Sequence, residues 1–432
     1  PKSIGNGSLT FTRNSGSMAY STSERIAHVY RRLGMGAHPE LVASTAGVTQ
    51  AIERSLSLED SPPTPFEMEP PLDRETATDV ATLAPVVASW LTSMANNPRV
   101  IEERLVWFWH DHFATAIQKV QIPYLMHRQH LTIREHATGS FRDLLHAVAF
   151  DPAMLFYLDG ARNHSAQINE NFAREVMELH TMGPGNYTQT DITEAAKALT
   201  GWVVFVPYGR QADRITGVGP WESFYVPFRH YSGTTTILGA TGRHTPSDVI
   251  DILLDQPQTA VFVAEQMWRE LVGTEPSPGT VEQLAAAFRS EYSIMDLVAE
   301  IAWHPEFVSE QAVRAKIRTP VERLVAVAQG FGDGTLHEQL GYVLYSMAYL
   351  PFNPPSPAGY PKGNLVLGPH QLIHAFDFLH ATSPDEYATV EELAARIGIF
   401  DLSTDTRRTI DSTGDQTVRT ALVLNSPEFA LV

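Results

Sequence analysis

Two glutamates spaced three residues apart, Glu175 and Glu178, are the most informative chemical feature of the sequence. In a helix over residues 170–182, this spacing places both carboxyl groups on one face, away from the apolar side chains. Paired carboxyl groups can act as general acid and base or can bind a metal ion. Asp191 lies on the next expected helix, 189–200, and the short loop between the two helices favours an antiparallel pair with converging acidic faces. Glu175, Glu178 and Asp191 are therefore the predicted catalytic residues.

Histidines elsewhere in the sequence supply candidate metal ligands. His110 and His112 flank Asp111 in a segment with helical character, where their side chains would point about 200° apart and could not share one ion. We therefore predict a site in which His112 or His110 joins Glu175 and His230. Imidazole and carboxylate ligands suit iron, zinc or manganese. The structural alternative is that these histidines lie in the core among aromatic side chains.

Polar and aromatic side chains of the same segments are the predicted substrate-binding residues, namely Asn171, Arg174, Trp109 and Tyr187. Two structural alternatives stay open for the acidic face. Arg174 and Glu178 could form an exposed ion pair four residues apart, or Asn171, Arg174 and Glu175 could form a buried network that only orders the helices. Polar residues also concentrate in the loop from residue 159 to 169, directly before the acidic helix.

Composition limits the classes of function. The 432 residues include no cysteine, which excludes disulfides, zinc–thiolate sites and cysteine nucleophiles. No P-loop, dinucleotide fingerprint, nucleophile elbow or two-histidine zinc motif occurs, so no nucleotide cofactor is expected. The formal charge of −18 argues against nucleic acid as a partner, because phosphates would be repelled. No apolar run reaches the roughly 18 residues of a membrane span. We expect a soluble protein; the absence of a visible signal peptide favours the cytoplasm, and an exported, processed chain is the alternative.

Helical periodicity dominates the chain, so the sequence predicts a mainly α fold. Residues 1–20 are expected to be a flexible lead-in. Residues 21–202 would form an N-terminal helical part with the acidic helix, and residues 246–432 a C-terminal helical part packed on it. Residues 203–245 are rich in Val, Phe, Tyr, Thr and Gly, which indicates a small β-hairpin or irregular insertion. Individual helices are expected, among others, over residues 22–36, 40–57, 75–97, 318–330 and 369–382.

Four segments, here called the signature segments, resemble the bacterial family known as domain of unknown function 1800. They are residues 32–36 (RLGMG), residues 107–113 (WFWHDHF), residues 169–202 (NENFAREVMELHTMG, then YTQTDITEAAKALTGW) and residues 351–361 (PFNPPSPAGYP), with SPEF at 426–429. Together they span nearly the whole chain. The resemblance implies a helical fold and does not imply a reaction.

Three functions fit these observations, and whether the protein is an enzyme stays open. The first is a metal-assisted enzyme, hydrolytic or oxidative, whose histidine and carboxylate cluster holds an ion that activates water or oxygen. The second is a metal-free acid–base hydrolase with carboxyl groups beside a small-molecule or glycan-like substrate. The third is a non-enzymatic binding or assembly protein in which the same residues stabilise the fold. A cleft near Glu175 would favour the enzymes. Oligomeric state is left open.

Overall fold

The computed structural model describes residues 20–209, 215–332, 340–367 and 389–432. In these ranges the chain is mainly helical with two small antiparallel sheets, which confirms the predicted fold class. None of the helices that these residues form combines the length and apolar character needed to cross a membrane. The predicted lead-in, apart from Tyr20, and the predicted helix over 369–382 lie outside the described residues.

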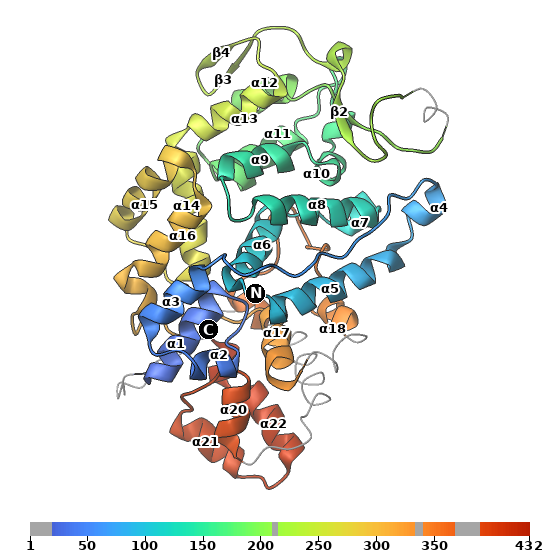
Figure 1. Ribbon diagram of the computed structural model, residues 1–432. Coiled ribbons are helices and arrows are strands. Elements are labelled where there is room, and N and C mark those ends of the chain that lie inside the picture. Colours follow the sequence, from blue (N-terminus) through green and yellow to red (C-terminus); the bar gives the residue numbers. More distant parts are fainter. Residues whose placement is uncertain (1–19, 210–214, 333–339, 368–388) are drawn as a thin grey trace, which may run out of the picture.

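The helices form an elongated body, with the β-hairpins at one end and the C-terminal helices at the other (Figure 1). The first part of the chain forms α1 (Thr22–Leu33), α2 (Pro39–Ala43), α3 (Val48–Leu56), α4 (Arg74–Ala77), η1 (Val80–Thr82), α5 (Leu83–Asn96), α6 (Val100–His112), α7 (Ile117–Val120), α8 (Pro123–His136), α9 (Phe141–Ala149), α10 (Pro152–Tyr157), η2 (Gly160–Arg162), α11 (Asn171–Glu175), η3 (Val176–Thr181) and α12 (Gln189–Ala198).

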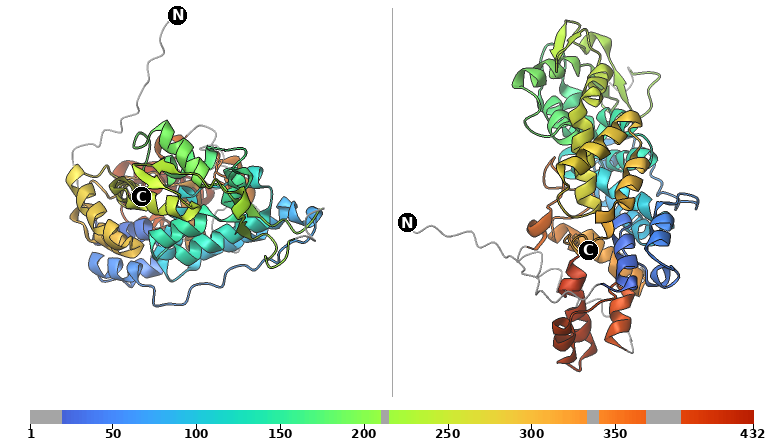
Figure 2. Two further views of the ribbon diagram at one scale, coloured as in Figure 1. Left: turned by 90° about the horizontal axis from the view of Figure 1, so that it is seen from above. Right: turned by 90° about the vertical axis from the view of Figure 1, so that its left-hand side faces the viewer.

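The second part of the chain returns along the body, as the side view in Figure 2 shows. It forms η5 (Pro227–Arg229), α13 (Pro246–Asp255), α14 (Pro257–Leu271), α15 (Pro278–Glu291), α16 (Ile294–Trp303), η6 (Pro305–Val308), α17 (Pro320–Phe331), α18 (Leu340–Ser346), η8 (Gly363–Leu367), α20 (Val390–Arg396), α21 (Thr404–Asp411), α22 (Gln416–Leu424) and α23 (Pro427–Ala430).

The predicted β insertion contains two hairpin-like pairs. Strands β1 (Trp202–Val204) and β2 (Ser223–Tyr225) pair antiparallel, and β3 (Thr235–Ile237) pairs with β4 (Ala240–Gly242). Three-residue strands bury little surface by themselves, so they depend on neighbouring helices. The β3–β4 hairpin lies against α12, which places the insertion beside the acidic signature segment.

Local signals explain where most helices begin. The side chain of Ser21 accepts the backbone N–H of Glu24 at the start of α1, and capping boxes begin α12, α13 and α17. The expected helix over 40–57 is two helices, α2 and α3, and the one over 75–97 is broken before α5. Helix α21 was not predicted, because its sequence TDTRRTID has one buried residue, Ile410, and therefore no apolar stripe.

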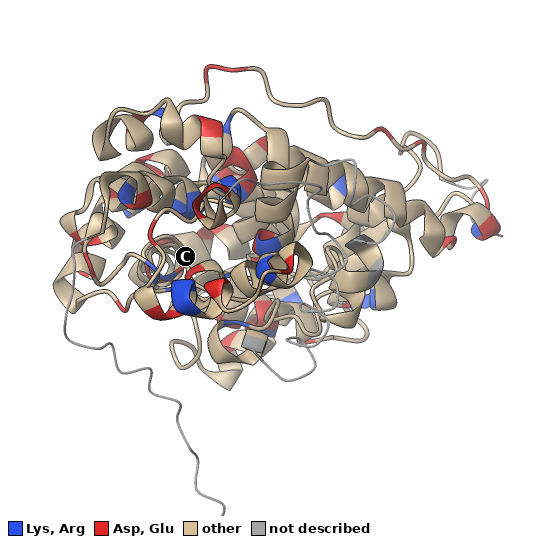
Figure 3. Ribbon diagram, turned by 90° about the horizontal axis from the view of Figure 1, so that it is seen from below, with Lys and Arg blue, Asp and Glu red and all other residues tan. Residues whose placement is uncertain are grey.

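Buried ion pairs join parts of the chain that are distant in sequence. Arg104 of α6 is 1% exposed and contacts Glu270 at 2.8 Å and Glu322 at 2.7 Å, while Lys316 pairs with the same two glutamates. Such charges are tolerated in a core only when they are paired and hydrogen-bonded. Basic and acidic positions are interspersed along the helices (Figure 3).

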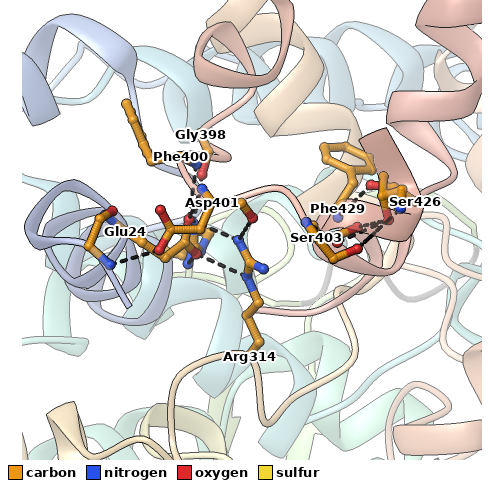
Figure 4. A network of polar contacts seen from close by, with 12 residues as sticks. Glu24, Arg314, Gly398, Phe400, Asp401, Ser403, Ser426 and Phe429 are labelled. Carbon is orange, nitrogen blue, oxygen red and sulfur yellow. Dashed lines mark hydrogen bonds and ion pairs between the residues drawn. The ribbon is translucent and has the colours of Figure 1, made fainter. Parts of the chain in front are cut away.

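A second buried network attaches the C-terminal helices to α1 (Figure 4). Glu24 is fully buried, pairs with Arg31 at 2.6 Å and Arg314 at 2.9 Å, and accepts the backbone N–H of Phe400 at 2.9 Å. Arg314 also donates to the carbonyl of Asp401. Three distant segments therefore depend on one carboxylate for their relative position.

Candidate functional site

The acidic signature helix has two parts with different backbone geometry. The α-helical turn α11 continues into η3, a π-helical turn in which the backbone N–H of Met182 bonds to the carbonyl of Met177 at 2.9 Å. The hydroxyl of Thr181 donates to the carbonyl of Val176 at 2.7 Å. This hydrogen bond gives a carbonyl group within the wider turn a partner. The sequence predicted one regular α-helix here. Single π-helical turns occur frequently at functional sites. The distortion therefore marks this segment as a candidate functional site.

The structure brings Glu175 and Glu178 close enough for their charges to interact. Burial, together with the charge on Glu178, raises the pKa of Glu175, and Arg174 and Lys119 oppose this rise. Tyr187 donates its hydroxyl proton to the Oε2 atom of Glu178 at 2.8 Å. One carboxyl group of the pair therefore favours its protonated form more than usual, while the other accepts a hydrogen bond from a phenol.

Residues of α7, of α10 and of the loop after α10 complete the surroundings of Glu175. Lys119 pairs with Asp159 at 2.9 Å, and its ammonium nitrogen lies 5.6 Å from the ring centre of Tyr157. Burial and the charge on Glu175 raise the pKa of Tyr157 to about 12. The side chain of Asn171, a predicted substrate-binding residue, donates to the carbonyl of Leu158 at 3.2 Å.

Sequence reasoning did not select Lys119, Tyr157 or Asp159. They come from separate elements, and no spacing rule connects them to the acidic helix. The one usable signal was the concentration of polar residues in the loop that begins at Asp159.

Neither structural alternative for Arg174 is what the structure shows. Its guanidinium bonds to Glu170 at 3.3 Å and to Gln189 at 3.0 Å, and its side chain is 39% exposed. It therefore forms no ion pair with Glu178, whose partner is Tyr187. A buried Asn171–Arg174–Glu175 network is likewise excluded by the exposure of Arg174. Arg174, predicted as a substrate-binding residue, is partly exposed, and its charge acts on Glu175.

Asp191 is engaged in contacts other than those predicted. Its Oδ2 atom accepts from the backbone and hydroxyl of Thr188, and its Oδ1 atom accepts the backbone N–H of Leu238 at 2.8 Å. Glu194, one turn along α12, accepts the backbone N–H of Thr236. The acidic face of α12 therefore binds the β3–β4 hairpin instead of converging with Glu175. Asp191 starts the helix and positions the insertion.

The two histidines of α6 lie on different sides of the helix. His110 is 1% exposed, packs against Trp90 and accepts the backbone N–H of Phe352 at 3.2 Å through Nε2. Burial lowers its pKa to about 3. His112 faces His180: its Nε2 lies 3.0 Å from the carbonyl of His180, and burial lowers the pKa of His112 to about 4. Both are neutral histidines packed among aromatic rings, as the structural alternative expected.

His230 is bonded to Thr200 through one ring nitrogen. Its Nδ1 lies 3.1 Å from the carbonyl and 3.3 Å from the hydroxyl of Thr200. Across the described ranges, no three His, Asp or Glu side chains gather in a way that could hold a metal ion. His112, His110, Glu175 and His230 therefore do not fit a common ion, and the arrangement gives no support to that ligand set.

Trp109 does not lie on a substrate-binding surface. Its side chain is fully buried, its indole N–H donates to the carbonyl of Ala137 at 3.1 Å, and its ring stacks on Phe113. The prediction selected Trp109 as an aromatic side chain of a signature segment. In the structure, α6 crosses the middle of the body and is covered on nearly every side.

Comparison with known proteins identifies the family and not an activity. No curated protein and no solved structure matches the chain. The family described as "Protein of unknown function (DUF1800)" matches residues 28–431, which include all four signature segments. Because this match covers nearly the whole chain, the protein belongs to the DUF1800 family.

Proposed function

We propose that this protein is a hydrolase that acts by general acid–base catalysis on a glycan-like substrate, with Glu175 as the acid and Glu178 as the base. The observation that carries the proposal is the pair of adjacent carboxyl groups in unlike surroundings. Two neighbouring carboxyl groups that lie in different surroundings commonly serve as the acid and the base of an active site. The predicted metal ligands are held apart, so no step of the proposal passes through an ion.

The chemical step uses both glutamates. Protonated Glu175 donates its proton to the oxygen of the leaving group as the carbon–oxygen bond breaks. Glu178, in its ionised form, accepts a proton from the water molecule whose oxygen forms the new bond to carbon. Release of products and exchange with solvent return the proton from Glu178 to Glu175, so the cycle balances.

Neighbouring side chains support these roles. The hydroxyl of Tyr187 fixes one oxygen of Glu178 and leaves the other oxygen for water, which makes Tyr187 a positioning residue. Lys119 limits the rise in the pKa of Glu175, because a cation favours the ionised carboxylate. A general acid is most effective when its pKa lies near the working pH, and the raised pKa of Glu175 is a change in that direction.

The test is hydrolysis of a panel of soluble polysaccharides, measured as release of reducing ends, by the wild-type protein and matched variants. Glu175→Gln should lower kcat by about 10²- to 10⁴-fold, which is the usual contribution of a general acid or base. Tyr187→Phe should lower kcat less and leave KM nearly unchanged. Glu265→Gln, which alters a partly exposed glutamate of α14 paired with Arg269, is the control and should behave like wild type.

Two results would contradict the proposal. One is a Glu175→Gln variant that hydrolyses the substrate at the wild-type rate. The other is a folded wild-type protein, shown by circular dichroism and cooperative unfolding, that releases no reducing ends from any polysaccharide in the panel.

A further inference from the structure

A polar pocket of about 830 Å³ lies next to η2 and the loop that precedes the acidic helix. Its walls come from η2, from the loop that precedes α11 and from η5, and its polar lining includes Asp159, Arg162, His164, Gln167, Glu170 and Arg229. The volume lies within the range of small-ligand sites. Asp159 connects the pocket to the glutamates, because its partner Lys119 also acts on Glu175.

The two carboxylates of this pocket already have partners. Asp159 pairs with Lys119 at 2.9 Å and with Arg162 at 3.6 Å. Glu170 accepts from the hydroxyl of Thr193 at 2.7 Å, from Gln189 at 2.8 Å and from Arg174 at 3.3 Å. A ligand therefore meets few free acceptors on this wall.

The donors of the pocket, in contrast, are largely unused. Arg229 makes one side-chain hydrogen bond, a long one of 3.4 Å to the carbonyl of Ala161, and its buried Nε atom has no partner among the described residues. No acidic side chain in the described ranges lies within ion-pair distance of Arg229, although the chain contains 49 acidic residues. The ring of His164 and the amide of Gln167 make no hydrogen bond with other described residues.

We infer that this pocket binds an anionic group of the substrate, a carboxylate or a sulfate, through Arg229 and Arg162. A guanidinium presents paired N–H groups that match two oxygens of such an anion, and these charge-assisted bonds are stronger than neutral ones. Phe228, next to Arg229, is 86% exposed and offers an aromatic face for a sugar ring. The inference rests on the proposed function and refines it: the substrate is an acidic carbohydrate.

Binding is measured first, so that it can be judged separately from hydrolysis. Isothermal titration calorimetry would compare sodium glucuronate, sodium sulfate and glucose on the full chain. We expect glucuronate to bind and glucose to bind far more weakly. Arg229→Gln should weaken glucuronate binding by about tenfold or more, the usual loss for a hydrogen bond to a charged group. Sulfate binding equal to that of glucuronate would assign recognition to the charge alone.

Matched variants separate the possible outcomes. Arg243→Gln removes an exposed arginine outside the pocket and should bind glucuronate like wild type. Arg162→Gln, at a side chain 85% exposed, cannot disturb the core and should give a smaller loss, which covers the case in which Arg229→Gln is unstable. Glu175→Gln should still bind glucuronate.

The inference is overturned if wild type binds neither anion, if glucose binds as well as glucuronate, or if both pocket variants bind like wild type. Normal anion binding without hydrolysis of any polysaccharide, acidic or neutral, would instead overturn the proposed function alone. Hydrolysis of neutral polysaccharides without anion binding would overturn the inference and leave the acid–base proposal intact.

Discussion

The carboxylate of Asp111 accepts the backbone N–H of Tyr360 at 2.7 Å, across 249 residues of sequence. Its other oxygen pairs with Lys362 at 2.8 Å. Asp111 lies in the WFWHDHF segment and Tyr360 in the PFNPPSPAGYP segment, so this contact joins two signature segments. The neighbouring His110 accepts the backbone N–H of Phe352 from the same loop. Part of the family signature thus positions the loop at 351–361. From the sequence alone, this structural role of the signature residues could not be told apart from a catalytic or metal-binding role.

Gly359 should be irreplaceable at this junction. Its φ is +88°, and a Cβ atom there would lie 2.1 Å from the Oδ1 atom of Asp111. Gly359→Ala should therefore lower the free energy of unfolding by more than the roughly 1–3 kcal/mol of a strained backbone alone. Gly185→Ala is the control, because Gly185 has φ +86° and open space at the Cβ position. Urea unfolding would measure both, and equal losses would show that the contact with Asp111 adds nothing.

Arg104 should be essential for stability. Arg104→Met would remove both of its ion pairs and leave Glu270 and Glu322 with Lys316 as their remaining cation. Breaking a buried pair typically costs about 3–5 kcal/mol. Arg142→Met, which removes an exposed pair with Asp251, should cost about 1 kcal/mol or less. A thermal melt of the two variants should separate them clearly; similar melting temperatures would refute the structural role of Arg104.

Stability should fall as the pH drops below about 6.5, because buried histidines resist protonation. Burial lowers the pKa of His180 from 6.5 to about 3, so between these values the unfolded chain binds a proton that the folded chain does not. The stability due to this group is present above pH 6.5 and is lost as the pH falls toward 3. His110 and His28 behave alike.

His180→Phe keeps an aromatic ring and removes one of these protons. The slope of unfolding free energy against pH, measured in urea between pH 5 and 6, should then decrease by about 1.4 kcal/mol per pH unit. An unchanged slope would mean that His180 is protonated in the folded protein.

The titration of Glu175 should respond in opposite directions to its two charged neighbours. Glu178→Gln removes a negative charge and should lower the pKa of Glu175, whereas Lys119→Met removes a positive charge and should raise it. NMR of selectively ¹³C-labelled glutamate carboxyl groups, with Glu175→Gln to assign the signal, measures this without a substrate. Shifts of the same sign in both variants would show that the pair does not interact as described. If Glu175 is the acid, the high-pH limb of activity should move with these values.

Sequence alone determined the helical fold class, most helix positions and the pairing of Glu175 with Glu178, because periodicity and i, i+3 spacing are local properties. It failed for α21, where a polar helix is stabilised by neighbouring segments and not by an apolar stripe of its own. It also failed for Trp109, since helical spacing gives the direction of a side chain but not what covers it.

Only the tertiary structure decided which polar groups meet. Asp191 binds the β3–β4 hairpin, His112 faces His180 and His230 bonds to Thr200, so the predicted metal ligands stay apart. Lys119 and Arg229 lie more than 50 residues from Glu175 along the chain, on either side of it, and Tyr157 belongs to a separate helix, α10. Contacts of this kind depend on how whole helices pack, and packing is set by the complete core and not by the spacing of residues within one segment.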